Sequence, residues 1–364
     1  QLDAGTGLGN GAVSVTGQAI ALGSVASDGD VTLSGGTGQV TVATSVIVAG
    51  DYSLTGGGFS TSVLSPYGAK TGAWIIDDTA GDFDFTGAAM EYFGDITLTA
   101  VGAATGGEIV SRTGDVSVEA DSGQIDALRG VGEVKAVARA GGMAVGEAQA
   151  IDRIEISTDG GAAKLGRAVL YGTGASALKL HAVDGDVLFG AASPGAITTT
   201  NALVSNGLAA VDLSSTTGKI DVNLYRASSP LANIQAPGAV TIKVAVSDLS
   251  IGSVVSTGDA VRITGPTDAL TINQLTAALS SSVDGGGEVR LVSANVDQDL
   301  SVRSATGGLR FGDATPGRVI DVAGSLSLDA STDITQQAAL RADGLGVSAG
   351  TGVVLLGDNQ VSFL

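Results

Sequence analysis

The chain contains no cysteine, and only 6 of its 364 residues are proline. The absence of cysteine excludes a disulfide framework, a thiolate metal site and a cysteine nucleophile together. It also fits a secreted bacterial protein that avoids wrong disulfides in transit. Proline is low although glycine is high, at 56 residues, which excludes collagen-like and proline-rich disordered chains.

Aromatic residues are scarce as well, at 4% of a chain that is 44% hydrophobic, so the interior must be built from Val, Ile, Leu and Ala. No apolar run approaches the ~18 residues that span a bilayer, so we expect no membrane-spanning segment. The chain begins with Gln1 and shows no charged-then-apolar leader, so we expect a processed chain or a part of a longer one.

Positive charge is the third shortage, with 18 basic residues against 37 acidic ones and a formal net charge of −19. Such a surface repels nucleic acid and anionic membranes, which excludes both as main partners. The charges are scattered singly along the chain, as on an ordinary solvated surface.

What the sequence does contain is a repeated phrase: glycine, polar residue, aliphatic, polar residue, aliphatic. It recurs near a period of 20 residues, as GDVTLSG from Gly29, GDYSLTG from Gly50, GDITLTA from Gly94, GDVSVEA from Gly114 and GAVTIKV from Gly238. Alternation with period 2, bounded by turn residues, predicts short strands. Segments 267–279 and 332–342 are the best helix candidates, but both also fit strands.

Two or three short strands per coil of about 20 residues, repeated without helices, predict an all-β parallel solenoid. We expect one continuous solenoid over 1–364, with about 18 coils and a length of roughly 85 Å at one strand spacing per coil. Glycine and the Gly-Asp pair are expected to supply corners with positive φ. A row of antiparallel sandwiches is the alternative, but it needs longer strands and more core aromatics than one Trp.

The phrases GDVTLSGGTGQVTV, GDITLTAVGAATGG, GKIDVNL and LGDNQVSFL resemble the repeat region of filamentous-haemagglutinin-like bacterial exoproteins, many of them exported by two-partner secretion. The resemblance covers the whole chain in style and consists of degenerate repeats. It implies a right-handed parallel β-helix with coils of about 20 residues, at the bacterial cell surface or in the extracellular space. No Asn-Pro dipeptide, which is typical of the family's secretion domain, occurs here, so the segment is similar to the shaft. Residues 352–364 end in mid-pattern without a polar cap.

Few residues point to chemistry. The one histidine, His181, alternates with Leu178 and Leu180 and should face outward from a strand. A lone histidine without cysteine predicts no transition-metal site. The phosphate-loop and nucleophile-elbow motifs are absent. The Gly-Asp corners leave incidental surface Ca²⁺ as the inorganic candidate, although the tandem Ca²⁺ repeat is missing. We expect no catalytic residue, no cofactor site and no structural metal.

Segment 52–93 stands apart because it holds eight of the aromatic residues among several acids. We interpret it as an insertion or elaborated coil whose aromatics cover one flank. Aromatic rings beside carboxylates are also typical of a surface that binds sugars or a partner, and clustered carboxylates are what a β-helix glycosidase needs. The candidate patch consists of Tyr67, Trp74, Asp77, Asp78, Asp82, Asp84 and Tyr92.

The sequence thus favours a non-enzymatic extracellular fibrous protein that serves in adhesion, aggregation or matrix assembly. The expected partners are other copies of the chain, joined head to tail or laterally, and glycans or proteins on host or cell surfaces. Affinity would come from many weak contacts. The alternative is a β-helical enzyme acting on polysaccharide, or a tailspike-like carbohydrate-binding protein.

Overall fold

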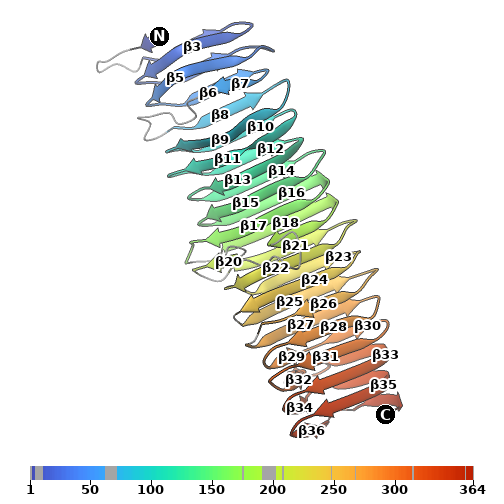
Figure 1. Ribbon diagram of the computed structural model, residues 1–364. Helices are drawn as coiled ribbons and strands as arrows, with labels where there is room; N and C mark the ends of the chain where they lie inside the picture. Colours follow the sequence, from blue (N-terminus) through green and yellow to red (C-terminus); the bar gives the residue numbers. More distant parts are fainter. Residues whose placement is uncertain are drawn as a thin grey trace. The chain divides into compact units, whose positions relative to one another are not determined.

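The computed structural model describes residues 2–4, 11–61, 72–173, 176–190, 202–206, 209–246, 248–266, 268–313, 315–356 and 358–363. All regular elements in these ranges are strands, which stack in parallel as a β-solenoid of about 16 turns with roughly 20-residue spacing (Figure 1). The predicted fold class is therefore confirmed, and both doubtful helix segments contain strands. Within these ranges there is no helix long and apolar enough to cross a membrane.

The chain divides into two compact units, Gln1–Gly172 and Thr173–Leu364, here called unit 1 and unit 2. Each is a stack of parallel coils. The single continuous solenoid over 1–364 stays a prediction, because the two units are described separately.

Unit 1 has three columns of parallel strands. The first column contains β2 (Val13–Thr16), β4 (Val31–Ser34), β6 (Tyr52–Gly56), β8 (Trp74–Asp78), β10 (Ile96–Ala100), β12 (Val116–Ala120), β14 (Glu133–Ala138) and β16 (Arg153–Gly160). The second contains β9 (Phe83–Tyr92), β11 (Ala103–Ser111), β13 (Ser122–Arg129), β15 (Met143–Ala150) and β17 (Ala163–Leu170). The third contains β1 (Leu2–Ala4), β3 (Ile20–Ser27), β5 (Val40–Val48) and β7 (Phe59–Thr61).

Unit 2 has two columns of parallel strands, which are more often interrupted. One column contains β18 (Ser176–Asp184), β21 (Ala209–Ser215), β23 (Leu231–Ala236), β25 (Leu249–Ser256), β27 (Leu270–Ala277), β29 (Val289–Leu291), β30 (Ala294–Val296), β32 (Leu309–Phe311), β34 (Asp333–Gln336), β36 (Gly352–Val354) and β37 (Gln360–Phe363). The other contains β19 (Val187–Gly190), β20 (Ala202–Ser205), β22 (Ile220–Ala227), β24 (Val240–Val246), β26 (Val261–Thr264), β28 (Ser281–Gly285) and β31 (Leu300–Ser304). Two long strands, β33 (Val319–Ala330) and β35 (Ala339–Ala349), pair with both columns.

The core is a set of inward columns in which each side chain lies on its counterpart one coil away. One such column in unit 1 is Val13, Val31, Tyr52, Trp74, Ile96, Val116, Val134 and Ile154. All eight side chains are buried. Because alternate residues of a strand face opposite sides, the period-2 pattern of the sequence becomes a dry interior and a polar exterior. Burying one such aliphatic side chain contributes about 1.5–3 kcal/mol.

Coil length varies more than the repeated phrase indicates, which is why the stack has fewer turns than the predicted 18. Tyr52 pairs with Trp74, 22 positions further on, so the described residues of segment 52–93 continue the stack in register. Residues 62–71 of that segment lie outside the described residues. A longer step occurs in unit 2, where Val187 pairs with Ile220, 33 positions further on.

The Gly-Asp corners do not depend on positive φ at their glycines, contrary to the expectation. Glycines with positive φ among the described residues are Gly36, Gly58, Gly87, Gly161, Gly190, Gly312 and Gly317, so the phrase glycines at 29, 50, 94 and 114 do not need that conformation. They are needed for close approach, since a Cβ on Gly114 would overlap the Asp95 carboxylate of the preceding coil. That Asp95 oxygen accepts a hydrogen bond from the Asp115 amide, at 2.9 Å.

This contact is a general device for joining coils. The aspartate of one coil accepts the amide hydrogen that follows the glycine of the next coil, as in Asp51 to Ala73 (2.7 Å), Asp82 to Ala103 (2.7 Å), Asp115 to Glu133 (2.7 Å), Asp186 to Lys219 (3.0 Å) and Asp299 to Ser325 (2.8 Å). The Gly-Asp pair is therefore a stacking signal between coils. The aspartate satisfies an amide that no ladder bond reaches.

Buried serines form a second device of the same kind. Ser111 Oγ donates to the Gly94 carbonyl of the preceding coil at 2.7 Å and accepts from the Gly114 amide at 2.8 Å. In unit 2, Ser304 bridges Gly287 and Gly307 in the same way, at 2.6 and 3.0 Å. The spacing Ser-x-Thr-Gly, which recurs at 111–114, 215–218 and 304–307, is the sequence signal for this role.

Candidate binding groove

The residues of the predicted patch do not gather on one surface. Tyr67 lies outside the described residues. Trp74 and Tyr92 are 1% exposed and belong to the core, and Asp78 is fully buried. Asp77 is half-buried, whereas Asp82 and Asp84 are exposed. The expectation of a sugar-stacking patch is therefore corrected for the two described rings, because neither offers a face to solvent.

Three aromatic rings of this segment, Tyr52, Trp74 and Tyr92, pack together in the interior instead. Trp74 lies against Tyr52, with ring centroids 5.7 Å apart, and against Tyr92, at 6.1 Å. The Tyr92 hydroxyl donates to the Gly50 carbonyl oxygen at 2.6 Å. Burial, together with the charges of Asp51 and Asp30, raises the pKa of Tyr92 to about 12. The alternation in Trp-Ile-Ile-Asp-Asp, in which Trp74 is in phase with Ile76, was the sequence signal for this inward direction.

Asp78 is an acid inside the stack. It occupies the inward position that Ala100 fills one coil later. Its Oδ1 accepts from the Ala80 amide at 3.2 Å, while among the described residues none hydrogen-bonds to its Oδ2. Burial raises the pKa of this carboxyl above its ordinary value, hydrogen bonds from the Ala80 and Gly58 amides oppose the shift, and the charges of Asp77 and Asp82 add to it.

The remaining acids of the segment serve local structure. Asp82 caps the Ala103 amide as described above, and Asp84 Oδ1 accepts from the Thr86 amide at 2.9 Å. That hydrogen bonding to Thr86 lowers the pKa of Asp84. His181 faces outward between buried Leu180 and Ala182, as expected, and its Nδ1 lies 2.8 Å from Ser214 Oγ.

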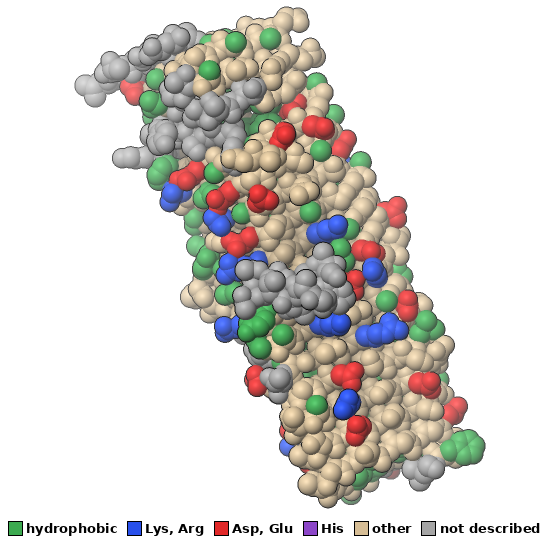
Figure 2. All heavy atoms as spheres, in the orientation of Figure 1, with side chains coloured by type: hydrophobic (Ala, Val, Ile, Leu, Met, Phe, Trp, Pro, Cys, Tyr) green, Lys and Arg blue, Asp and Glu red, His purple; other side chains and the backbone are tan. Residues whose placement is uncertain are grey.

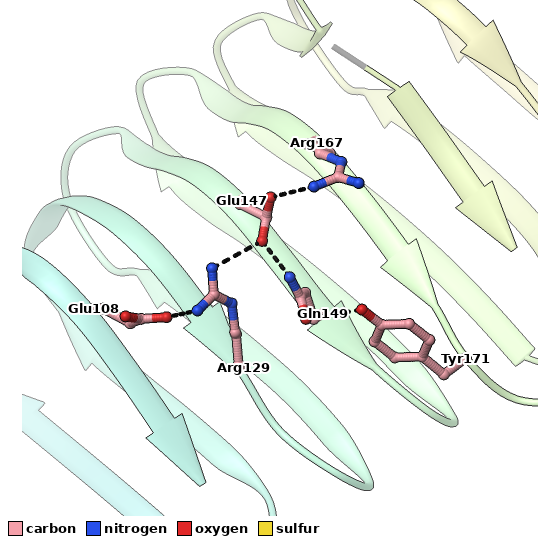
Figure 3. Close-up of polar contacts among 6 residues, drawn as sticks. All are labelled: Glu108, Arg129, Glu147, Gln149, Arg167 and Tyr171. Carbon is pink, nitrogen blue, oxygen red and sulfur yellow. Dashed lines mark hydrogen bonds and ion pairs between the residues drawn. The ribbon is translucent and has the colours of Figure 1, made fainter. Parts of the chain in front are cut away.

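A better candidate site lies on the outer face of unit 1, which sequence analysis missed. Four charged residues from successive coils, Glu108 on β11, Arg129 on β13, Glu147 on β15 and Arg167 on β17, form a ladder of ion pairs (Figure 3). Arg129 contacts Glu108 on one side and Glu147 on the other, with Nη2 to Oε1 at 3.1 Å. Arg167 Nη1 lies 2.7 Å from Glu147 Oε2.

Glu147 is the centre of this ladder. Its side chain is 19% exposed, and Gln149 Nε2 also donates to it. Burial raises the pKa of the Glu147 carboxyl, but hydrogen bonds from Arg167, Gln149 and Arg129 outweigh that effect and hold the pKa below its ordinary value. Tyr171, which follows β17, donates from its hydroxyl to Gln149 Oε1 at 3.1 Å, as Figure 3 shows. The ladder thus fixes the orientation of both Gln149 and Tyr171.

The ladder borders a groove of about 500 Å³ at the corner that follows β9, β11, β13, β15 and β17. Its rim carries one apolar side chain on most coils: Phe93, Val131, Ile151 and Tyr171. Phe93 is 40% exposed, Ile151 38% and Tyr171 49%. Arg112, Thr113 and Gln149 add hydrogen-bonding groups to the lining. Because successive coils are about 4.8 Å apart, the rim extends over roughly 19 Å from Phe93 to Tyr171.

Elsewhere the described surface offers little for chemistry. Figure 2 shows acidic and basic side chains interspersed with hydrophobic and other side chains on the visible face. Among the described residues, no group of three or more His, Cys, Asp or Glu could hold a metal ion. A hollow of about 440 Å³ in unit 2 is lined by Arg290 and Arg310, of which Arg310 pairs with Glu288 at 2.7 Å.

Comparison of the chain with protein-family models, with curated proteins and with solved structures finds no match. The resemblance of its repeats to filamentous-haemagglutinin-like exoproteins therefore rests on the quoted phrases alone.

Proposed function

We propose that the chain is a non-enzymatic, extracellular scaffold at the bacterial surface, of the filamentous-haemagglutinin-like type, which serves in adhesion, aggregation or matrix assembly. The observation that carries the proposal is how the charged side chains are used. In the Glu108–Arg167 ladder and in the aspartate caps, they connect one coil to the next. Charged side chains that pair between coils stabilise the stack and do not converge on a reacting group.

The coil construction suits that role. Inward columns of Val, Ile, Leu and Ala are dry, and the backbone amides are paired between coils or capped by Asp and Ser. Such a scaffold presents the same outer positions at intervals of one coil, which favours binding through many repeated weak contacts.

A polysaccharide-acting β-helix is the second candidate, because a groove with exposed aromatic side chains is also a feature of sugar-binding surfaces. Glu108 and Glu147 are two carboxylates near that groove. Both are engaged by Arg129, and the pKa of Glu147 is lowered, whereas a general acid needs a raised pKa. This electrostatic setting favours binding over hydrolysis.

The proposal is tested on cells of the source organism. Antibodies raised against the purified chain should label the surface or the surrounding matrix of intact cells in immunogold electron microscopy. Deletion of the gene should reduce cell aggregation or attachment. Label confined to the cell interior would contradict the proposal. Release of reducing sugar ends from a polysaccharide by the purified chain, above a heat-denatured control, would favour the enzyme.

A further inference from the structure

We propose that the groove of unit 1, between the ion-pair ladder and the rim Phe93–Val131–Ile151–Tyr171, binds an uncharged polysaccharide. The inference deepens the proposed function and rests on it for biological meaning. It is nevertheless a property of the purified chain, so it can be tested separately.

The first argument is the exposure of large apolar side chains at consecutive corners. Phe93, Ile151 and Tyr171 stand out from the surface although the solenoid does not require apolar residues there, since Thr113 occupies the same rim. Exposed apolar groups that line up along a surface commonly mark a binding site. A pyranose ring has an apolar C–H face that packs on an aromatic ring, and Phe93 and Tyr171 offer such rings at the two ends of the rim.

The polar groups of the groove are also held in fixed positions. Gln149 and Tyr171 are held by the ladder, so their positions are set before a ligand arrives. Preorganised hydrogen-bonding groups beside an apolar rim are what orient a ligand in a pocket. Because successive coils are about 4.8 Å apart, lining side chains on neighbouring coils are spaced at regular steps, which suits a polymer with a regular repeat.

The third argument concerns charge and identifies the ligand as uncharged. Around the groove, three acids pair with three bases: Glu91 with Arg112, Glu108 with Arg129, and Glu147 with Arg167. Beyond the rim lie the exposed acids Asp95, Asp115, Glu133 and Asp152. Two arginines, Arg112 and Arg129, line the groove, and each is already paired with an acid outside the lining. Neither is left to pair with a uronate or sulfate polymer, and the acids beyond the rim repel one.

The same charge argument disfavours other occupants. A second copy of the chain brings its own net charge of −19 to the surface. A folded protein partner would need to bury well over 1,000 Å² in all, so its interface would have to extend beyond the groove. A glycan strand of a few sugar rings fits the groove's volume of about 500 Å³.

The test compares two soluble polymers with the same backbone, hydroxyethylcellulose and carboxymethylcellulose, which differ in charge. Galactomannan and dextran extend the neutral set, and alginate the anionic set. Each polymer is cast into a native gel, and the retardation of the purified chain is measured. We expect retardation by at least one neutral polymer and none by carboxymethylcellulose or alginate.

Variants then locate the site. Tyr171→Ser should weaken binding about tenfold, the amount that one lost aromatic contact supplies, and Phe93→Ser/Tyr171→Ser should abolish it. Tyr171→Phe should retain most of the affinity, because it keeps the ring. Val101→Ser is the matched control, since Val101 is exposed on unit 1 but lies outside the groove. Circular dichroism checks that each variant keeps its fold.

Three results would overturn the inference: no retardation by any neutral polymer, stronger retardation by the anionic polymers, or equal binding by the wild type and the double variant. Loss of a dimer on Tyr171→Ser, seen by analytical ultracentrifugation without any glycan effect, would assign the groove to a second copy instead. If antibodies label the cell surface but the purified chain binds no glycan, this inference is refuted and the proposed function stands. If the chain is intracellular but binds glycan, the proposed function is refuted and this inference stands.

Discussion

In unit 1 the groove after β15 is rimmed by Phe93, Ile151 and Tyr171, whereas in unit 2 a groove of about 450 Å³ after β22 is lined by Ser228, Pro230 and Asp248. Both grooves lie at corners of parallel coils with the same inward columns of buried aliphatic residues. The coil therefore dictates the inward positions and leaves the corner side chains free. Apolar residues at a corner position, where the coil does not require them, therefore indicate a binding surface. The unit 2 groove serves as the reference for this comparison.

The interiors differ in a second way. Unit 1 contains the buried aromatic residues Tyr52, Trp74 and Tyr92 and the buried acid Asp78, while the buried aromatic residues described in unit 2 are Phe189 and Phe311, and its buried polar residues, such as Asn223 and Gln336, are uncharged. Yet the stacking devices, aspartate caps and serine bridges, occur in both units. A shared scaffold with local departures leads to four predictions, from the largest effect to the smallest.

The closest approach between coils should be the most sensitive point. A Cβ on Gly94 would overlap the carbonyl oxygen of Gly72, so Gly94→Ala forces two coils of unit 1 apart. We expect a loss of about 3 kcal/mol in the free energy of unfolding, measured by urea denaturation. Gly346→Ala in unit 2 is the control, because a Cβ there meets nothing within 4 Å. Equal effects at the two positions would contradict the stacking geometry.

The serine bridges should be equivalent in the two units. Ser111→Ala in unit 1 and Ser304→Ala in unit 2 each leave an amide and a carbonyl without their partner. We expect each variant to lose about 1–3 kcal/mol in thermal or urea unfolding. Ser301→Ala, at an exposed position on β31, should change stability by less than about 0.5 kcal/mol. A loss in only one unit would show that the scaffold is not shared.

The buried acid of unit 1 should make stability depend on pH in an unusual direction. Because the pKa of Asp78 is raised, the folded state binds the proton more tightly than the unfolded state. The favourable contribution is complete below the ordinary pKa of about 3.9 and is lost as pH rises through the raised value. Asp78→Asn keeps the hydrogen bond from Ala80 and should stabilise the chain at pH 7 by about 1–2 kcal/mol.

The gain from Asp78→Asn should vanish near pH 3, where the wild-type carboxyl is protonated as well. Asp77→Asn on the outer side of the same strand is the control and should give a smaller change. If Asp78→Asn is less stable than the wild type at pH 7, the buried, ionised Asp78 carboxylate does not destabilise the folded chain.

The ion-pair ladder beside the groove should make stability depend on pH in the opposite direction. The pKa of Glu147 is lowered, so its contribution is present above the ordinary carboxyl pKa of about 4.3 and is lost as pH falls through the lowered value. Glu147→Gln should cost about 0.5–1 kcal/mol at pH 7 and nothing at low pH. Glu288→Gln in unit 2 breaks a more exposed pair and should cost less. An equal cost at pH 3 and pH 7 would point to packing instead of charge.

The sequence predicted the fold because the alternation of apolar and polar residues within each strand determines which side chains face inward. Alternation in a segment such as Ile-Thr-Leu-Thr-Ala (96–100) is enough to assign faces and a coil period. Composition alone does not assign the aromatic residues of segment 52–93 to a face. Trp74 alternates in phase with Ile76 and faces the core, whereas Phe93 is exposed at the rim of the groove.

What the sequence could not supply is the pairing of side chains across coils. Glu108, Arg129, Glu147 and Arg167 look like isolated charges until the register places them on neighbouring coils. The rim had a usable signal, since Val131, Ile151 and Tyr171 follow one another at intervals of 20 residues. The role of glycine in the Gly-Asp pair needed the backbone of the preceding coil and could not be inferred from the pair alone.

The register itself can be tested most directly with introduced cysteines, because the chain has none of its own. Thr97 pairs with Ser117, and Ser117 pairs with Lys135, all at outward positions. Neighbouring coils place Cα atoms about 4.8 Å apart, within the range of a disulfide, whereas two coils place them near 10 Å, beyond it. On mild oxidation, Thr97→Cys/Ser117→Cys should form an intramolecular disulfide and Thr97→Cys/Lys135→Cys should not. The reverse result, or cross-linking of neither pair, would contradict parallel coils stacked in this register.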